Sequence, residues 1–244
     1  VRSRGLGDVY KRQHLKTVMD FSFFDKVNTA KNEQTDTWFK GLDRVYNNFV
    51  YDYLYPNPAS VLAFIENHDT DRFLGEGENL DMLKQASTLL LTTRRIPQLY
   101  YGTEVMMNGV KSKSDGYVRK DFPGGWADDK ENALTPEGRT RLQNESYNFY
   151  RNLLNWRKGN DVIAKGSMKQ FMVQHGVYAY ARQYKGKTVF VLLNGTDKEV
   201  KLPLKYYAEV LKDKTQGKDV ISGKVTALNE ELTMAPRQSM VIEL

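Results

Sequence analysis

The chain from residue 14 to about residue 157 alternates short apolar runs with amphipathic stretches. The apolar runs lie near Thr17–Phe21, Val61–Ile65 and Ile96–Tyr101, and each is followed by a segment with helical spacing. A short apolar run followed by a helix is typical of a βα unit, and successive βα units form a parallel sheet. The pattern therefore predicts three βα units in this part of the chain.

The predicted helices are recognised by their apolar faces and their caps. The apolar residues of the first helix recur with a helical period, which gives one apolar face: Trp38, Phe39, Leu42, Val45, Tyr46 and Phe49. Asn79 is the expected N-cap of a second helix, whose apolar face carries Leu83, Ala86 and Leu90. A third helix is expected from about Thr140 to Lys158, after a long loop rich in glycine and charge.

After Gly166 the apolar period changes from that of a helix to that of a strand. Eight short segments fit strands: MKQFMV, VYAYAR, TVFVLLN, VKLPL, AEVL, KDVIS, ELTM and SMVIEL. Turn signals separate them at Tyr184–Lys187, Asn194–Gly195 and Ser222–Gly223. Many short strands in succession predict an antiparallel β-sandwich, so we place a domain boundary near residue 165.

Composition narrows the classes of function. The net charge of +6 is concentrated at the N-terminus, where Arg2, Arg4, Lys11 and Arg12, less Asp8, supply +3. No basic stripe interleaved with aromatic residues follows, which argues against nucleic-acid binding. The absence of cysteine excludes a disulfide framework and thiolate chemistry. No apolar run approaches the roughly 20 residues that cross a bilayer, so we expect no membrane association. A bacterial cytoplasmic, periplasmic or secreted protein would fit equally well.

The first 13 residues, VRSRGLGDVYKRQ, have no initiator Met and no periodicity. They resemble the translated adapter sequence found at the ends of assembled gene fragments. We interpret residues 1–13 as a non-native leader and exclude them from the fold. If that interpretation holds, the natural chain begins further upstream.

The segment FIENHDTDRF, from Phe64 to Phe73, holds the chemistry of this chain. Asn67, His68 and Asp69 place an amide, an imidazole and a carboxylate side by side, directly after the predicted strand at Val61–Ile65. In a parallel α/β barrel the carboxyl ends of the strands are where catalytic side chains collect. The alternative interpretation is a strand followed by a polar turn that caps a helix.

The order of these motifs resembles the C-terminal half of the α-amylase family of glycoside hydrolases, over residues 14–244. In that family a (β/α)8 barrel precedes a β-sandwich, and Asn-His-Asp follows the seventh strand. Val18–Phe24 resembles the sixth strand, and Tyr100–Glu104 has the Tyr-Tyr-Gly-x-Glu form of the eighth. HDTDRF with DGYVRKDFPGGW is similar to the neopullulanase and cyclomaltodextrinase branch. The resemblance implies barrel strands six to eight over residues 14–165 and a C-terminal β-sandwich over residues 166–244.

The resemblance also implies roles for the residues of this segment. Asp69 would be the acid that binds sugar hydroxyls and stabilises the transition state, without forming a covalent bond. His68 would hydrogen-bond the same sugar. Asn67 and Arg72 are the other expected substrate-binding residues: Asn67 would position the loop, and Arg72 would pair with a carboxylate or with substrate. For both, the alternative is a capping or surface contact. The expected ligand is an α-glucan oligosaccharide: a starch-type chain, pullulan or a cyclodextrin, with the bond type and the oligomeric state left open.

The motifs for the family's nucleophilic Asp and acid/base Glu have no counterpart before Asp69. The upstream acids stand in unrelated contexts: Asp20, Asp25, Glu33, Asp36, Asp43 and Asp52. We therefore expect a catalytically incomplete fragment of a retaining α-glucan hydrolase, inactive alone. The alternative is a non-catalytic carbohydrate-binding or assembly protein derived from the same fold. No cofactor is implied; calcium sites occur in the family, but this sequence shows no cluster with calcium-ligand spacing.

Overall fold

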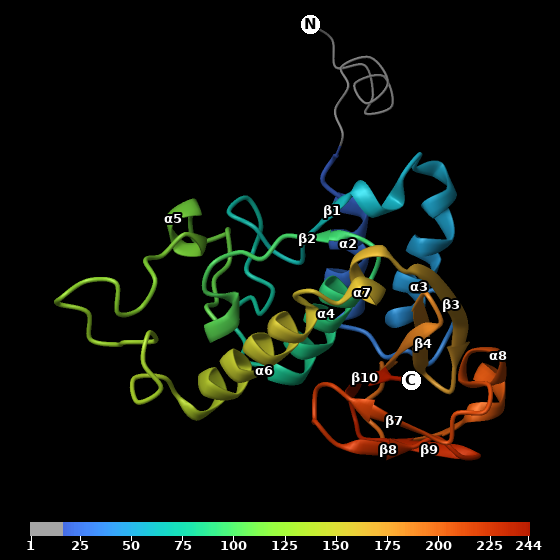
Figure 1. Cartoon of the computed structure of the whole chain (residues 1–244). Helices are drawn as coiled ribbons and strands as arrows, with labels where there is room; N and C mark the ends of the chain where they lie inside the picture. Colours follow the sequence, from blue (N-terminus) through green and yellow to red (C-terminus); the bar gives the residue numbers. More distant parts are fainter. Residues whose placement is uncertain (1–16) are drawn as a thin grey trace, which may run out of the picture.

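The computed structural model describes residues 17–244 (Figure 1), and the predicted leader at residues 1–13 lies outside them. Three segments of the first part run parallel to one another. The short strands β1 (Leu62–Ala63) and β2 (Ile96–Pro97) form one ladder, and Met19 makes a parallel bridge to Leu62 on the other side of β1. The order Met19, β1, β2 follows the chain, as expected for successive βα units.

Helices surround these parallel segments. The α-helices of this part are α2 (Phe21–Ala30), α3 (Leu42–Val50), α4 (Leu80–Thr92), α5 (Asp115–Val118), α6 (Arg141–Arg157) and α7 (Asp161–Lys165). Short 3-10 turns lie between them at η1 (Tyr51–Leu54), η2 (Pro58–Ser60) and η3 (Thr103–Val105). Figure 1 shows α6 running beside α4, with the long loop that carries α5 extending away from both.

Two of the predicted helix starts are confirmed by their caps. The Asn79 side chain accepts a hydrogen bond from the Met82 N–H at the start of α4. At the start of α6, the Thr140 side chain accepts from the Gln143 N–H while Gln143 reaches back to the Thr140 N–H, which is a capping box.

The prediction for the first helix is wrong in its start. The helix begins at Leu42 rather than Trp38, because Phe39 and Gly41 have φ angles of 60° and 54° and the chain cannot be helical there. The side chains of Trp38 and Phe39 are exposed instead of joining the apolar face. The predicted strand at Thr17–Phe21 is also cut short, because the Asp20 carboxylate accepts from the Phe23 N–H and starts α2.

The second part of the chain is antiparallel, which confirms the predicted β-sandwich. Its larger sheet has the order β3-β4-β5-β10-β7-β8 and its smaller sheet pairs β6 with β9. Their bounds are β3 Ser167–Gln174, β4 Val177–Tyr184, β5 Lys187–Asn194, β6 Val200–Pro203, β7 Gln216–Asp219, β8 Val225–Ala227, β9 Glu231–Met234 and β10 Ser239–Glu243. The tight hairpin predicted at Tyr184–Lys187 joins β4 to β5.

One predicted strand of the sandwich is a helix. The segment AEVL forms α8 (Ala208–Leu211), which continues the 3-10 turn η4 (Leu204–Tyr207). Ala, Glu and Leu are strong helix formers, so local propensity decides where the apolar pattern is too short to do so. The strand β8 (Val225–Ala227) lies between two predicted strands, in a segment to which the apolar pattern assigned no strand.

The strands β4 and β5 of the larger sheet are buried over most of their length. Along β4, Tyr178 and Tyr180 pack into the core formed with the helices, whereas Val177, Ala179 and Ala181 pack into the core beneath the smaller sheet. This alternation explains why β4 reads as an unbroken apolar run. The helical part and the sandwich therefore share one core. The boundary near residue 165 stays a prediction, close to the start of β3 at Ser167.

Candidate functional site

The loop after β1 forms a tight turn whose shape is set by Asn67. The Asn67 Oδ1 accepts a hydrogen bond from the Asp69 N–H at 2.8 Å, and the Thr70 Oγ1 accepts from the Asn67 N–H at 3.0 Å. The Asn67 residue is only 4% exposed. Its amide is therefore turned into the loop, where it fixes the direction of the residues that follow.

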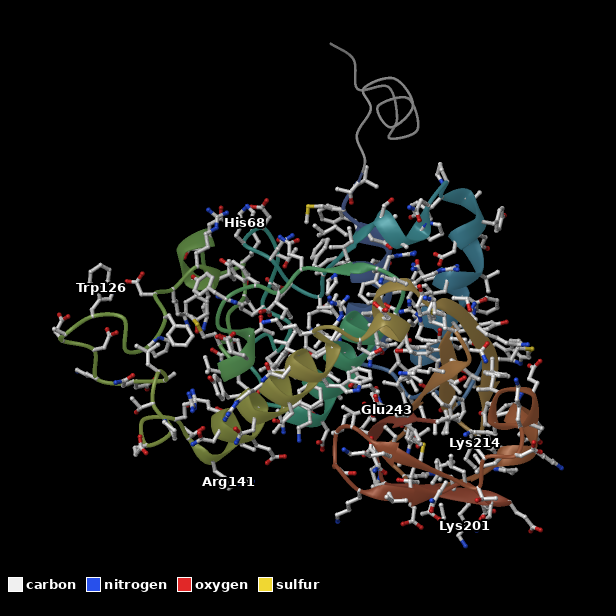
Figure 2. The ribbon with its side chains drawn as sticks, in the orientation of Figure 1. His68, Trp126, Arg141, Lys201, Lys214 and Glu243 are labelled. Atoms are coloured by element: carbon white, nitrogen blue, oxygen red, sulfur yellow. The ribbon has the colours of Figure 1, made fainter. Side chains whose placement is uncertain are left out.

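His68 and Asp69 project from this turn into solvent. Each side chain is 61% exposed, and the His68 Nε2 lies 3.3 Å from the Asp69 Oδ2. Figure 2 shows His68 at the outer edge of the molecule, near the loop that carries α5. An imidazole and a carboxylate in this arrangement offer a hydrogen-bond donor and acceptors to a polar ligand.

Arg119 holds the turn from outside. Its Nε donates to the His68 carbonyl oxygen at 2.8 Å, and its Nη2 donates to the Asp69 Oδ1 at 3.1 Å. The same nitrogen lies 3.3 Å from the Asp115 Oδ2, and the Lys111 Nζ donates to the Asp69 carbonyl oxygen at 3.0 Å. Sequence reasoning missed these contacts, because the long loop signalled only charge and mobility. The two cations place Asp69 in a positive local field.

Arg72 does not line the exposed surface of the loop, and the structure contradicts its predicted contact with substrate. The residue is 1% exposed, and its Nη1 donates to the Tyr101 carbonyl oxygen at 2.6 Å. Its Nε donates to the Val118 carbonyl oxygen at 3.0 Å, and its guanidinium lies 4.0 Å from the centre of the Tyr100 ring. Arg72 thus joins the loop after β1 to the segment after β2 and to α5. Arg72 instead pairs with a carboxylate, which was the other contact that the sequence predicted for it.

That carboxylate belongs to Glu66, which sequence reasoning also missed. The Arg72 Nη1 lies 3.2 Å from the Glu66 Oε1, and the Thr103 hydroxyl donates to the same oxygen. Burial raises the pKa of Glu66, while the bonds from Thr103 and the Phe73 N–H and the charge of Arg72 act in the opposite direction. The signal that could have found it is an ionisable residue placed directly after the apolar run Val61–Ile65, where the predicted strand ends.

Most of the upstream acids are engaged away from Asp69. The guanidinium of Arg95 donates to Asp20 at 2.9 Å and also pairs with Asp52, and all three side chains are buried. Glu33 accepts two bonds from Arg44 at 2.7 Å. Asp43 accepts a hydrogen bond from the Phe39 N–H, and Asp25 pairs with Lys26. These carboxylates stabilise the fold locally.

The described part of the chain shows neither a metal cluster nor a membrane-spanning helix. Residues 17–244 contain no group of three or more His, Cys, Asp or Glu side chains arranged to hold a metal ion. Within the same residues, every helix is too short or too polar to cross a bilayer.

The sandwich matches a known family model. Residues 168–243 match the cyclo-malto-dextrinase C-terminal domain. In sequence, the chain is similar to a cyclomaltodextrin glucanotransferase of Thermoanaerobacterium thermosulfurigenes, with 32% identity over 178 residues. It is also similar to an α-amylase of Niallia circulans, with 28% identity over 221 residues. These alignments cover 73% and 87% of this chain, but only 22% and 38% of the relatives.

Solved structures share the fold of the whole described chain. The α-amylase from Geobacillus thermoleovorans, complexed with acarbose, superposes with a TM-score of 0.75 at 19% identity over 96% of this chain. The α-amylase from H. orenii gives 0.71 at 23% identity over 97% of this chain. The match spans 49% and 50% of those two chains. The chain therefore corresponds to about half of each solved structure.

Proposed function

We propose that this chain, which belongs to the α-amylase family, supplies part of the substrate site of an enzyme that cleaves α-glycosidic bonds in starch-type oligosaccharides, pullulan or cyclodextrins. One observation carries the proposal. The exposed pair His68 and Asp69 follows the carboxyl end of β1 in a parallel ladder, on a turn that Asn67 and Arg119 hold in place. This is the end of parallel strands at which barrel enzymes build their sites.

In this proposal Asp69 acts by stabilising charge. Glycoside cleavage passes through a transition state that resembles an oxocarbenium ion, so positive charge develops at the anomeric carbon. A carboxylate that accepts sugar hydroxyls helps most if those hydrogen bonds strengthen as that charge grows. His68, whose Nε2 is 3.3 Å from Asp69, would contact the same sugar. Arg119 would orient the carboxylate from the side away from the ligand.

The nucleophile and the acid/base would come from elsewhere. A retaining glycosidase needs two carboxyl groups about 5 to 5.5 Å apart on either side of the bond. Asp20, Glu33 and Asp52 are committed to guanidinium groups in other parts of the fold. Asp115 shares Arg119 with Asp69, so it is bound to a cation rather than free for transfer chemistry. We therefore retain the interpretation that the described residues are catalytically incomplete.

The parallel segments would then be strands six to eight of a (β/α)8 barrel. Within residues 17–244, Met19 pairs only with β1 and β2 only with β1, which leaves a free ladder edge on each side. Met19 and Ile96, on these edges, are 40% and 44% exposed. A strand that is normally central in a sheet exposes apolar residues when the adjacent strand is missing. The exposed Met19 and Ile96 therefore support the proposal that further strands belong on both edges.

The test is the release of reducing ends from maltooligosaccharide, pullulan and cyclodextrin by the purified chain. We expect no release above the blank from the wild type or from Asp69→Asn, with both variants folded. Asp128→Asn serves as the matched control, because Asp128 is an exposed aspartate in the loop between α5 and α6 and its side chain makes no hydrogen bond among the described residues. If the wild type and Asp128→Asn release reducing ends and Asp69→Asn does not, the interpretation that the nucleophile and the acid/base are absent is refuted. The proposed role of Asp69 would then be supported.

A further inference from the structure

A hollow lies at the junction of the helical part and the sandwich. Its volume is about 550 Å³, and its walls come from the segment before α3, from the turn between β3 and β4, and from the loop between β5 and β6. In Figure 1, α3 and β3 lie on the opposite side of the molecule from α5, and Figure 2 places His68 on the α5 side. The hollow is therefore separate from the loop that carries Asp69.

The walls of the hollow are fixed by close packing. The Thr35 N–H donates to the Gly195 carbonyl oxygen at 3.0 Å, and the Thr35 Oγ1 accepts from the Leu42 N–H at 2.9 Å. A Cβ on Gly176, whose φ is +78°, would lie 2.4 Å from the Thr196 Cγ2. The segment before α3 is thus bound to the loop between β5 and β6, and the Gly195 N–H of that loop donates to the Gly176 carbonyl oxygen at 2.9 Å, so a ligand would meet a pre-formed surface.

Trp38 forms an aromatic rim of this hollow. It lines the cavity and is 70% exposed. Its neighbour Phe39 has the left-handed φ of 60°, and the Phe39 N–H donates to the Asp43 Oδ2 at 2.6 Å. This contact holds the chain out of α3 immediately after Trp38. A bulky residue in a left-handed conformation has an energetic cost, so a strained segment that exposes a tryptophan is a candidate for recognition.

Five polar or charged side chains around the hollow are uncommitted within the described part of the chain. Among residues 17–244, none of the following side chains makes a hydrogen bond or an ion pair: Asp36, Gln174, His175, Lys198 and Glu199. Together they provide hydrogen-bond donors and acceptors, and charges of both signs, from all three segments that form the hollow. A few polar groups converging around an apolar platform are typical of small-molecule sites.

The chemistry of the lining selects the class of ligand. Asp36 and Glu199 outnumber the single Lys198, which disfavours a phosphate or another anion. Residues 17–244 hold no group of three or more His, Cys, Asp or Glu side chains that could bind a metal ion, here or elsewhere, which disfavours a metal cation. The uncommitted polar groups in the lining disfavour a purely apolar molecule, which would leave them without partners. A sugar has an apolar C–H face that stacks on an indole and a rim of hydroxyls that both donate and accept.

We propose that this hollow binds a segment of an α-glucan chain, with one sugar ring stacked on Trp38. The site is carbohydrate-binding and non-catalytic, and its identification with α-glucan rests on the proposed function. A second contact point on the same protein raises the effective concentration of a long glucan at the first. Affinity should therefore increase with the length of the oligosaccharide.

The test measures the affinity of the folded 244-residue chain for maltoheptaose by isothermal titration calorimetry. We expect Trp38→Ala to weaken binding about tenfold, since it removes the stacking platform. Trp126→Ala is the matched control, because Trp126 is 65% exposed on the far loop seen in Figure 2. That control should bind as the wild type does. Asp36→Ala, on the rim of the hollow, is the second variant and should weaken binding less than Trp38→Ala.

Several outcomes overturn the proposal. It fails if the wild type does not bind maltoheptaose, or if Trp38→Ala and Asp36→Ala both bind as tightly as the wild type. Equal affinity for cellohexaose, which has β-linked glucose units, would overturn the assignment to α-glucan. Asp69→Asn separates the two sites. Binding that depends on Trp38 and is unaffected by Asp69→Asn supports the hollow even if the proposed role of Asp69 fails.

Discussion

The Nη1 of Arg72 lies 3.2 Å from the Oε1 of Glu66, and the two side chains are only 1% and 2% exposed. Glu66 ends the apolar run before the turn, and Arg72 follows that turn. The pair therefore closes the base of the loop that presents His68 and Asp69. Because Arg72 also donates to the carbonyl oxygens of Tyr101 and Val118, it ties this loop to its neighbours.

Replacing Arg72 should unfold the base of this loop. Arg72→Met removes the cation and leaves the Glu66 carboxylate buried without its partner, which typically costs about 3–5 kcal/mol. Urea unfolding followed by circular dichroism measures this cost. Arg141→Met is the control, because the Arg141 side chain is 82% exposed and its ion pair with Glu145 is a surface pair. A loss of stability equal to that of Arg141→Met would contradict the structural role of Arg72.

The stability of the protein should depend on pH through Glu66. Burial raises the pKa of this carboxyl above its ordinary value of 4.5. A group whose pKa is higher in the folded state contributes stability that is fully present below the unfolded pKa and is lost as pH rises through the folded pKa. We expect the free energy of unfolding of the wild type to fall, relative to Glu66→Gln, as pH increases above 4.5. Parallel urea titrations over a pH series would show the trend, and the opposite slope would overturn it.

Loss of Arg119 should loosen the turn without unfolding the protein. Arg119→Met removes the bonds to the His68 carbonyl oxygen and the Asp69 carboxylate. The side chain is 39% exposed, so the free energy of unfolding should change by less than about 1 kcal/mol. Amide hydrogen exchange at His68 and Asp69 should become faster, with no change in the strands of the sandwich. Unchanged exchange at those two amides would show that Arg119 does not hold the turn.

Arg182 should be essential for the junction between the sheet and the helices. It is 1% exposed in β4, and it donates to the carbonyl oxygens of Thr92 at 2.8 Å, Ile163 at 2.9 Å and Gly166 at 2.8 Å. Arg182→Met leaves the buried carbonyl oxygens of Thr92 and Ile163 unsatisfied, at a cost of about 1–3 kcal/mol each before relaxation, and also removes the half-buried bond to Gly166. Thermal unfolding of this variant should occur well below that of Arg141→Met. Equal midpoints would mean that water replaces the guanidinium.

Local signals explain which parts of the fold were predictable. Asn79 and Thr140 announce helix starts because a cap acts on residues at most three positions away. The hairpin at Tyr184–Lys187 is equally local. The start of α3 was missed because the break at Phe39 depends on contacts that the apolar spacing does not reveal. One such contact joins Thr35 to Gly195, far along the chain.

In the candidate site, too, the residues that are adjacent in sequence were predictable, and those brought together by the fold were not. Asn67, His68 and Asp69 are adjacent in sequence, so their types and their position after a strand point to polar chemistry. Arg119 comes from a loop about 50 residues later, and no local pattern pairs it with Asp69. Glu66 was invisible for another reason, because an acid in an apolar run has no evident partner until the fold brings Arg72 against it. Long-range pairing therefore limits sequence reasoning at this site.

The most direct measurement is the mapping of maltoheptaose contacts by NMR on the isotope-labelled chain. The account predicts that titration shifts the amide resonances of His68, Asp69 and Arg119, and that Asp69→Asn abolishes these shifts while the fold is retained. Shifts around Trp38 would persist in that variant. If maltoheptaose at saturation leaves the resonances of His68, Asp69 and Arg119 unmoved in the wild type, the loop after β1 is not an α-glucan site and the central claim is wrong.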